Sequence, residues 1–331
     1  MVKNKQPSKF FIVGCARSGT TLVHKLVASH SQVVGVFETY LLKKFNPKRS
    51  INEIISHTAR NEKEYRMVLE HFKTLDKKNL GAFEFLDEYC EAHRHHFKKS
   101  AYVEKSPLHT LFIGELLTQI PKSKIIAVLR DPRAIIGSRL HGHKASRPYS
   151  YRVPRKLSFI LDLSQILFSY KQLNKWYLSL NKRLNKRILF IKYEDLIKKP
   201  EQITRKILTF LELPWEPVHN NINPIDIRLE HYALKEIMNS SYGKKKSFTI
   251  QGDSLEKWKE VITFAEAKFI KQCISQAKLK VIEDFYPYVG QSKSKSPKVF
   301  LMKIFSVLDY YFFLKKNIGS KLKKNLKIKL I

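Results

Sequence analysis

Cysteine is scarce in this sequence. The 331 residues include only three cysteines, Cys15, Cys90 and Cys273, and no two of them form a Cys-x-x-Cys pair. Disulfide scaffolds and cysteine-ligated zinc sites both need cysteines at close, paired spacings. The sequence therefore argues against both, and we expect the protein to work in a reducing compartment.

Long apolar runs are scarce as well. Near the N-terminus the run Phe10–Val13 passes straight into Gly14, so it is too short for a secretory signal or a membrane-spanning helix. Residues 299–314 form a longer apolar stretch, but Lys303 and Asp309 interrupt it. We therefore expect no membrane span, no export and a cytoplasmic location.

Acidic residues are few compared with basic ones. The chain has 29 Asp and Glu against 62 Lys and Arg, a formal net charge of +33. Such an excess attracts polyanions, so nucleic acid, a phosphorylated cofactor and anionic lipid are the partner classes to consider. The content of 43% hydrophobic and 12% aromatic residues excludes a largely disordered chain. Charge predicts a class of partner here, not a reaction.

Three segments have the pattern of a strand followed by a turn and a helix. Apolar residues fill Phe10–Val13, Lys124–Leu129 and Arg187–Tyr193, and helical spacing of apolar residues follows each run. Ala101–Glu104 predicts a fourth strand. Strands that alternate with helices form a parallel sheet covered on both faces, with the ligand crevice at the carboxyl ends of the strands. The predicted fold is therefore a three-layer α/β fold with a parallel sheet.

The segments between these units predict the domain organisation. Residues 45–100 and 141–185 are rich in charge and helical in pattern, so we expect helical inserts within one domain over residues 8–289. A small, polar segment at 290–298 predicts a linker. The lysine-rich, aromatic residues 299–331 then form a C-terminal tail.

The turn after the first strand has the spacing of a phosphate-binding loop. Gly14 and Gly19 fit the pattern G-x-x-x-x-G, in which glycines let backbone N–H groups turn toward an anion at a helix N-terminus. A nucleotide kinase or GTPase continues with a lysine that reaches the phosphates. This chain has Thr20 at that position, and its positive charge is Arg17, inside the loop. The loop predicts an anion site, and the alternative is an ordinary glycine turn.

Two motifs in the expected order resemble one known family. Arg17-Ser18-Gly19-Thr20-Thr21 resembles the [RK]-S-G-T-T loop of sulfotransferases that use 3′-phosphoadenosine 5′-phosphosulfate (PAPS). Their second signature, an Arg after a strand with a Ser on the next helix, is similar to Arg130 and Ser138. Tyr193–Leu196 and Leu255–Trp258 are further matches. The resemblance is greatest to the branch that includes tyrosylprotein and carbohydrate sulfotransferases.

The resemblance implies PAPS as cofactor, its product PAP, and no metal. It assigns the 5′-phosphosulfate to the loop residues Arg17, Ser18, Gly19, Thr20 and Thr21. It assigns the 3′-phosphate to Arg130 and Ser138, and a further nucleotide contact to Ser241. For Arg130 the alternative is an Arg–Asp pair that only closes the turn, since Asp131 and Arg133 also lie there.

The resemblance also implies catalytic residues. Sulfuryl transfer needs a base for the acceptor and cations for the oxygens of the moving group. In the tyrosylprotein branch the base is a Glu followed by Thr after the first helix, which corresponds to Glu38 here. Lys105, which follows the fourth predicted strand, is the candidate contact of the sulfonate, and Arg17 would share this task. A Glu-Thr helix cap and a solvated lysine are the alternatives.

The predicted reaction is transfer of a sulfuryl group from PAPS to a hydroxyl or amine of an acceptor that the sequence does not identify. Glycans and lipids are candidate acceptors, and the inserts at 45–100 and 141–185 would select among them. The alternatives are a P-loop kinase or NTPase and a basic nucleic-acid-binding protein, although the sequence has no helix-turn-helix, zinc or RNP pattern.

Two remaining features have open interpretations. The tail at 299–331 predicts either contact with an anionic membrane surface, which would make the protein peripheral, or a helix docked on the domain. His93, His95 and His96, together with Glu91, resemble metal ligands. Adjacent positions on a helix point in different directions, so we expect a solvated face there.

Overall fold

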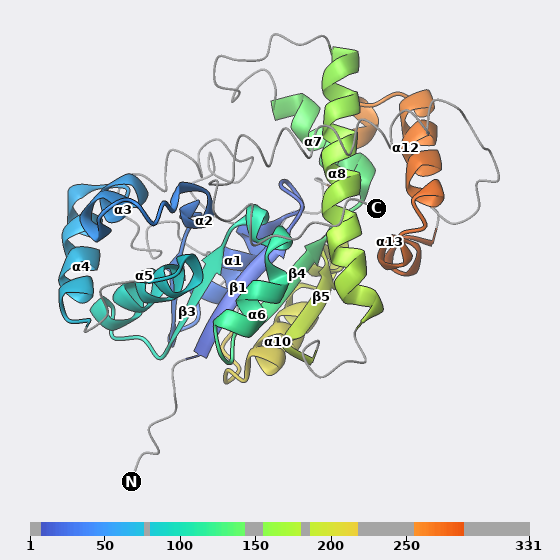
Figure 1. The fold of residues 1–331 in the computed structure, drawn as a ribbon. Helices are drawn as coiled ribbons and strands as arrows, with labels where there is room; N and C mark the ends of the chain where they lie inside the picture. Colours follow the sequence, from blue (N-terminus) through green and yellow to red (C-terminus); the bar gives the residue numbers. More distant parts are fainter. Residues whose placement is uncertain (1–7, 76–79, 143–154, 180–185, 218–254, 288–331) are drawn as a thin grey trace.

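The computed structural model describes residues 8–75, 80–142, 155–179, 186–217 and 255–287 (Figure 1). The predicted nucleotide contact Ser241 lies outside these ranges. The predicted linker and the tail at 299–331 lie outside them too.

One parallel sheet forms the centre of the fold. Its strands are β1 (Ser8–Gly14), β2 (Val33–Val36), β3 (Ala101–Lys105), β4 (Lys124–Leu129) and β5 (Ile188–Lys192), in the spatial order β2-β3-β1-β4-β5. All neighbouring strands pair in parallel. The structure confirms the predicted α/β fold class and all four predicted strands. It adds β2, which the sequence analysis did not predict.

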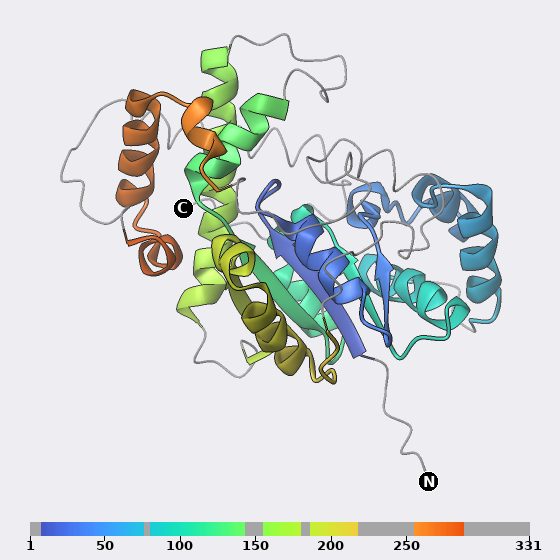
Figure 2. The same cartoon turned by 180° about the vertical axis from the view of Figure 1, so that it is seen from behind.

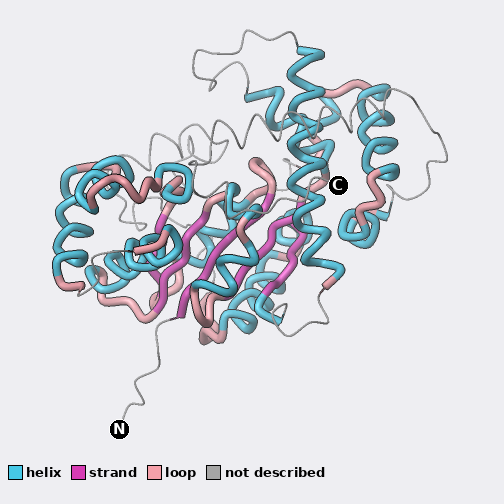
Figure 3. Tube along the Cα trace, viewed as in Figure 1, coloured by secondary structure: helices cyan, strands magenta, loops and turns pink. Residues whose placement is uncertain are grey.

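Helices cover both faces of the sheet, so the strands form a middle layer (Figure 3). The helices and short 3-10 helices, in chain order, are α1 (Thr20–Ala28), α2 (Leu41–Lys44), α3 (Ile51–Thr58), α4 (Glu62–Lys73), α5 (Ala82–His96), η1 (Pro107–Leu111), α6 (Ile113–Gln119), α7 (Pro132–Gly142), α8 (Arg155–Leu178), α9 (Tyr193–Lys198), α10 (Pro200–Leu211), η4 (Lys257–Glu260), α12 (Phe264–Gln276) and α13 (Lys280–Phe285).

The alternation of side chains along β1 explains why two cores form. Phe11 and Val13 point to the face covered by α5, α6 and α8, which lies toward the viewer in Figure 1. Phe10 and Ile12 point to the face covered by α1 and α10, seen in front in Figure 2. Successive residues of a strand point to opposite faces, so a strand buried on both sides is apolar throughout. This is why β1 and β4 were evident from sequence as continuous apolar runs.

Helix α8 belongs to the larger of these cores. Its residues Phe159, Leu163, Ile166 and Leu173 are buried in the same cluster as the side chains of the sheet. The helix therefore covers one face of the sheet. Among the described residues, no helix is both long and apolar enough to cross a membrane.

The packing of α8 can be tested with two leucines of that helix. Leu163 is fully buried, whereas Leu157 is 44% exposed. Leu163→Ala should lower the free energy of unfolding by about 2–5 kcal/mol, because it removes buried methyl groups and leaves a cavity. Leu157→Ala should lower it by less than about 1 kcal/mol. Urea unfolding measures both changes, and equal losses would contradict the packing described.

Candidate active site

The parallel sheet brings the candidate residues to one edge. Gly14 ends β1 and starts the loop, Glu38 follows β2 by two positions, and Lys105 ends β3. Arg130 follows β4 and Tyr193 follows β5. Because the carboxyl ends of parallel strands lie together, all five strands deliver a candidate residue to the same edge of the sheet. This is the edge at which the sequence predicted the ligand site.

The loop between β1 and α1 has an unusual backbone. Gly14, Arg17 and Gly19 have φ angles of 151°, 78° and 98°, a region that glycine adopts easily and arginine does not. A Cβ at Gly19 would lie 2.2 Å from the ring of Tyr193. The Ser18 hydroxyl is buried and has no hydrogen-bond partner in the described part of the chain. A buried polar group without a partner is costly, and a bound oxyanion would supply one.

The two predicted anion sites contact each other. The Arg130 guanidinium donates a hydrogen bond to the Arg17 carbonyl at 3.0 Å, and the Arg17 Nε donates to the Ser138 hydroxyl at 3.1 Å. Arg130 also lies over the ring of Tyr193, 4.4 Å from its centre. The loop signature and the Arg130 to Ser138 signature therefore form one continuous surface.

Positive charge is concentrated at this surface. Arg139, next to Ser138, donates hydrogen bonds to the Ala16 carbonyl at 3.3 Å and to the Cys15 Sγ at 3.3 Å. Burial, followed by the like charges of Arg130 and Arg139, lowers the pKa of the Arg17 guanidinium. An anion placed among these groups would relieve this repulsion, so the site fits a phosphate or phosphosulfate.

The turn after β4 leaves Arg130 oriented toward the loop. Asp131 pairs with Arg133 at 2.7 Å, so the Arg–Asp pair that the alternative interpretation expected closes the turn through Arg133. The Tyr170 hydroxyl contacts both the backbone N–H of Arg130, at 3.0 Å, and its carbonyl oxygen. The backbone of Arg130 is therefore fixed by α8.

The candidate base and the candidate sulfonate contact form an ion pair. The Lys105 Nζ contacts one carboxylate oxygen of Glu38 and lies 3.3 Å from the Thr21 hydroxyl. It also lies 4.1 Å from the centre of the Phe37 ring, and its side chain is 1% exposed. The Tyr40 hydroxyl donates a hydrogen bond to the other Glu38 oxygen. Lys105 is therefore a buried residue of the site, and the solvated-lysine alternative is wrong.

Sequence reasoning missed several residues of this site. The sequence motifs identified Tyr193 only as the start of a further family match, and the structure places its fully buried ring against Gly19 and Arg130. Tyr40 has a positive φ of 50°, which is rare for a bulky residue and is typical of functional sites. The only sequence signal for these two residues was their position. Tyr40 lies two residues after Glu38, and Tyr193 begins the family match Tyr193–Leu196. No sequence motif indicated the contacts of Arg139 and Tyr170.

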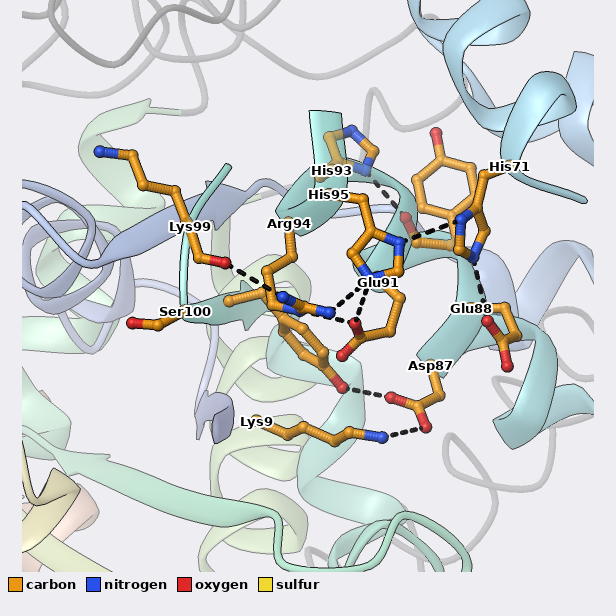
Figure 4. A network of polar contacts seen from close by, with 12 residues as sticks. Lys9, His71, Asp87, Glu88, Glu91, His93, Arg94, His95, Lys99 and Ser100 are labelled. Carbon is orange, nitrogen blue, oxygen red and sulfur yellow. Dashed lines mark hydrogen bonds and ion pairs between the residues drawn. The ribbon is translucent and has the colours of Figure 1, made fainter. Parts of the chain in front are cut away.

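The histidines of α5 do not form a solvated face as a group. His95 is exposed, but His93 is buried, so the expectation is wrong for His93. Arg94 donates to the His95 Nε2, so the His95 Nδ1 carries the hydrogen that faces the His71 Nδ1 at 3.4 Å (Figure 4). The His71 Nε2 then donates to Glu88 at 3.0 Å. These hydrogen bonds use the lone pairs of the His71 and His95 rings. The described residues contain no group of three or more His, Cys, Asp or Glu that could hold a metal ion.

His24 lies close to the ion pair of Lys105 and Glu38. Its Nε2 donates to the Val103 carbonyl at 3.2 Å, and its ring meets the Phe37 ring edge-on, 5.6 Å between centres. Burial, followed by the charge of Lys105, lowers the pKa of His24 to about 3. This imidazole is therefore neutral at physiological pH.

Comparisons with known proteins agree with these motifs. The model of the Sulfotransferase family matches residues 7–217. A protein-tyrosine sulfotransferase of Drosophila melanogaster is 29% identical over 222 residues, which make up 64% of this chain and 39% of that protein. An uncharacterized protein of Aquifex aeolicus is 26% identical over 258 residues, 76% of this chain and 31% of that protein. The chain thus spans well under two thirds of the length of these relatives.

A solved structure shares the fold. The sulfotransferase domain of the Synechococcus PCC 7002 olefin synthase superposes with a TM-score of 0.51 at 17% identity. The match covers 82% of this chain and 96% of that domain.

The neutral state of His24 predicts a pH dependence of stability. An unfolded histidine takes up a proton near pH 6.5, whereas folded His24 does so only near pH 3. Stability is therefore lost as the pH falls from about 6.5 toward 3. In His24→Gln the slope of the unfolding free energy between pH 4.5 and 6 should be smaller by up to about 1.4 kcal/mol per pH unit. Urea titrations measure it. The exposed His57→Gln is the control, and a wild-type slope in His24→Gln would contradict the prediction.

Proposed function

This chain belongs to the sulfotransferase family, and we propose that it transfers the sulfuryl group of PAPS to a hydroxyl or amine of an acceptor. The observation that carries the proposal is the contact between two anion sites beside a Glu–Lys pair. Arg17 reaches Ser138, Arg130 reaches the Arg17 backbone, and Lys105 pairs with Glu38. PAPS carries negative charge on its 5′-phosphosulfate and on its 3′-phosphate. A PAPS-dependent enzyme therefore needs a binding site for each of these groups and a base beside them.

The chain offers groups for both charged ends of PAPS. The loop residues that would hold the 5′-phosphosulfate are Arg17, Ser18, Gly19, Thr20 and Thr21. The buried Ser18 hydroxyl, which has no hydrogen-bond partner among the described residues, supports this assignment. Arg130 and Ser138 would hold the 3′-phosphate, which the guanidinium can contact through two N–H groups. We also assign Ser241 to the nucleotide, on the family resemblance alone.

The ion pair suggests how the reaction would proceed. Donor binding would place the sulfonate near Lys105, whose ammonium would then leave Glu38 for an oxygen that gains negative charge. The acceptor oxygen or nitrogen forms a bond to sulfur, and the bond from sulfur to the phosphate oxygen breaks. The acceptor proton moves to the freed Glu38 carboxylate, and PAP departs. Arg17 would stabilise the same oxygens from the loop, and this chemistry needs no metal.

The acceptor and the location are separate proposals. We propose a glycan or a lipid as acceptor, and a cytoplasmic enzyme that contacts an anionic membrane surface through residues 299–331. The lysine-rich composition of that tail supports the membrane contact. The Drosophila relative is named a protein-tyrosine sulfotransferase, so tyrosine peptides belong in the same assay.

Labelled donor tests the proposed reaction. The protein is incubated with [³⁵S]PAPS and with separate pools of glycans, lipids, tyrosine peptides and small phenols. We expect label in one pool and an equal amount of PAP. If no pool gains label while the protein transfers the γ-phosphate of ATP instead, the proposal is wrong.

Replacing Arg130 should separate two nucleotides. Arg130→Ala should weaken PAP binding about ten- to a hundredfold, because it removes a charge-assisted contact worth about 1.5–3 kcal/mol. Binding of adenosine 5′-phosphosulfate, which lacks the 3′-phosphate, should change little. Calorimetry measures both affinities, with Arg133→Ala as control because Arg133 pairs with Asp131 in the same turn. Equal losses for the two ligands would remove Arg130 from the 3′-phosphate site.

Replacing Glu38 should affect turnover and leave donor binding intact. Glu38→Gln keeps the shape of the side chain but cannot accept the acceptor proton, so kcat should fall about 10²- to 10⁴-fold. PAP affinity should stay within about threefold of wild type, since the change lies outside the phosphate sites. Steady-state assays with the acceptor pool that takes label measure the effect, with exposed Glu62→Gln as control. Turnover near the wild-type rate would exclude Glu38 as the base.

A further inference from the structure

Arg60 connects the helical segment at 45–100 to the candidate base. It lies between α3 and α4, and its Nη2 donates a hydrogen bond to the backbone carbonyl of Glu38 at 3.2 Å. Its guanidinium also lies 5.1 Å from the centre of the Phe37 ring. Arg60, a residue of the helical segment, therefore contacts both the backbone of Glu38 and the side chain of Phe37.

Glu64 fixes Arg60 in turn. One of its carboxylate oxygens accepts a hydrogen bond from the Arg60 backbone N–H at 2.8 Å. The other accepts bonds from the Tyr89 hydroxyl at 2.8 Å and from the His93 Nε2 at 3.0 Å. Hydrogen bonds and the charges of His93 and Arg60 outweigh burial and lower the pKa of Glu64 to about 2. Glu64 is thus ionised, and its hydrogen bonds to Tyr89 and His93 join α4 to α5.

His93 is a buried partner of Glu64. Its side chain is 3% exposed, its Nδ1 faces the Tyr89 carbonyl at 2.9 Å, and its Nε2 faces the Glu64 carboxylate at 3.0 Å. Removing His93 would leave the buried Glu64 carboxylate with one hydrogen-bond partner fewer, and a buried polar group that loses a partner is costly.

We propose that Arg60, Glu64 and His93 are positioning residues that hold Glu38 for catalysis. The segment at 45–100 then contributes to the rate of the reaction in addition to any role in acceptor choice. The inference rests on the proposed function of Glu38. The physical reason is distance: a displacement of about 1 Å at a reacting group can cost about a hundredfold in rate, and Arg60 fixes the backbone from which the Glu38 carboxylate extends.

A double-mutant cycle tests the proposal. Arg60→Gln should lower kcat about ten- to a hundredfold and leave the PAP affinity within about twofold of wild type. In a Glu38→Gln background the same change should have almost no further effect on kcat, because Arg60 acts only through Glu38. Arg66→Gln is the matched control, since Arg66 is 75% exposed and pairs only with Glu62 among the described residues. The assay uses the acceptor pool that takes label from wild-type protein and [³⁵S]PAPS.

Each outcome gives a decision. If Arg60→Gln slows the Glu38→Gln enzyme by the same factor as the wild type, Arg60 acts independently of Glu38 and the proposal is wrong. If Glu38→Gln is slow but Arg60→Gln is not, the positioning role is wrong and the base assignment stands. If Glu38→Gln has no effect, the assignment of Glu38 as the base is wrong instead.

A crystal structure provides a readout that needs no acceptor. In Arg60→Gln bound to PAP, the Glu38 backbone should shift and its carboxylate should leave the position seen in Arg66→Gln. An unchanged Glu38 would overturn the proposal. If Arg60→Gln does not fold, Arg60→Lys replaces it in both experiments, because the ammonium keeps the charge beside Phe37 while losing the geometry of the guanidinium. Arg60→Lys should show the same pattern with a smaller loss of kcat, and an unshifted Glu38 with wild-type kcat would overturn the proposal.

Discussion

Parallel pairing of the five strands is the constraint on which the site depends. Each strand runs in the same direction, so each carboxyl end delivers its next residue to the same edge. Residues as far apart in sequence as Gly19 and Tyr193 meet there because β1 and β5 both pair with β4. The strands are largely buried, and the candidate residues lie at their carboxyl ends or shortly after them.

Electrostatic imbalance is the second property of this edge. Arg17, Arg130 and Arg139 come close together, Asp162 pairs with Arg139 at 3.3 Å, and Glu38 is the carboxylate that contacts Lys105. Such crowding is unfavourable without an anion and becomes favourable when one binds. Glu38 thus neutralises Lys105 before a ligand arrives. The net charge of +33 shows the same preference for anions over the whole chain.

Sequence patterns predicted the fold wherever the structural signal was local. The apolar runs of β1 and β4, the glycine spacing of the loop and the signature of Arg130 and Ser138 are each contained within a few residues. Strand β2 was missed because it has only four residues, Val33–Val36, with a glycine among them. The roles of Glu38, Lys105 and the phosphate contacts stay predictions, although the structure brings all the described ones to one edge of the sheet.

Contacts between distant segments were beyond sequence reasoning. Arg60 had no motif to single it out, and its link to Glu38 depends on how α3 and α4 pack. His93 belongs to a charged stretch of α5 that also contains the exposed His95 and His96, and its contact with Glu64 depends on how α4 packs on α5. The Tyr170 hydroxyl accepts a hydrogen bond from the Arg130 backbone N–H. Tyr170 lies on α8, a segment for which the sequence predicted a helix but no contact with Arg130. Each of these positions is determined by tertiary packing, which local periodicity does not encode.

A preference for a nucleotide with a 3′-phosphate separates the proposed sulfotransferase from a kinase or NTPase, and calorimetric titration with PAP, ADP and ATP plus Mg²⁺ measures it. PAP carries the 3′-phosphate assigned to Arg130 and Ser138, whereas ADP and ATP lack it. We expect PAP to bind at least about tenfold more tightly than either, the equivalent of one charge-assisted contact. Tighter binding of ATP with Mg²⁺ than of PAP would contradict it and would indicate a nucleotide kinase or NTPase instead.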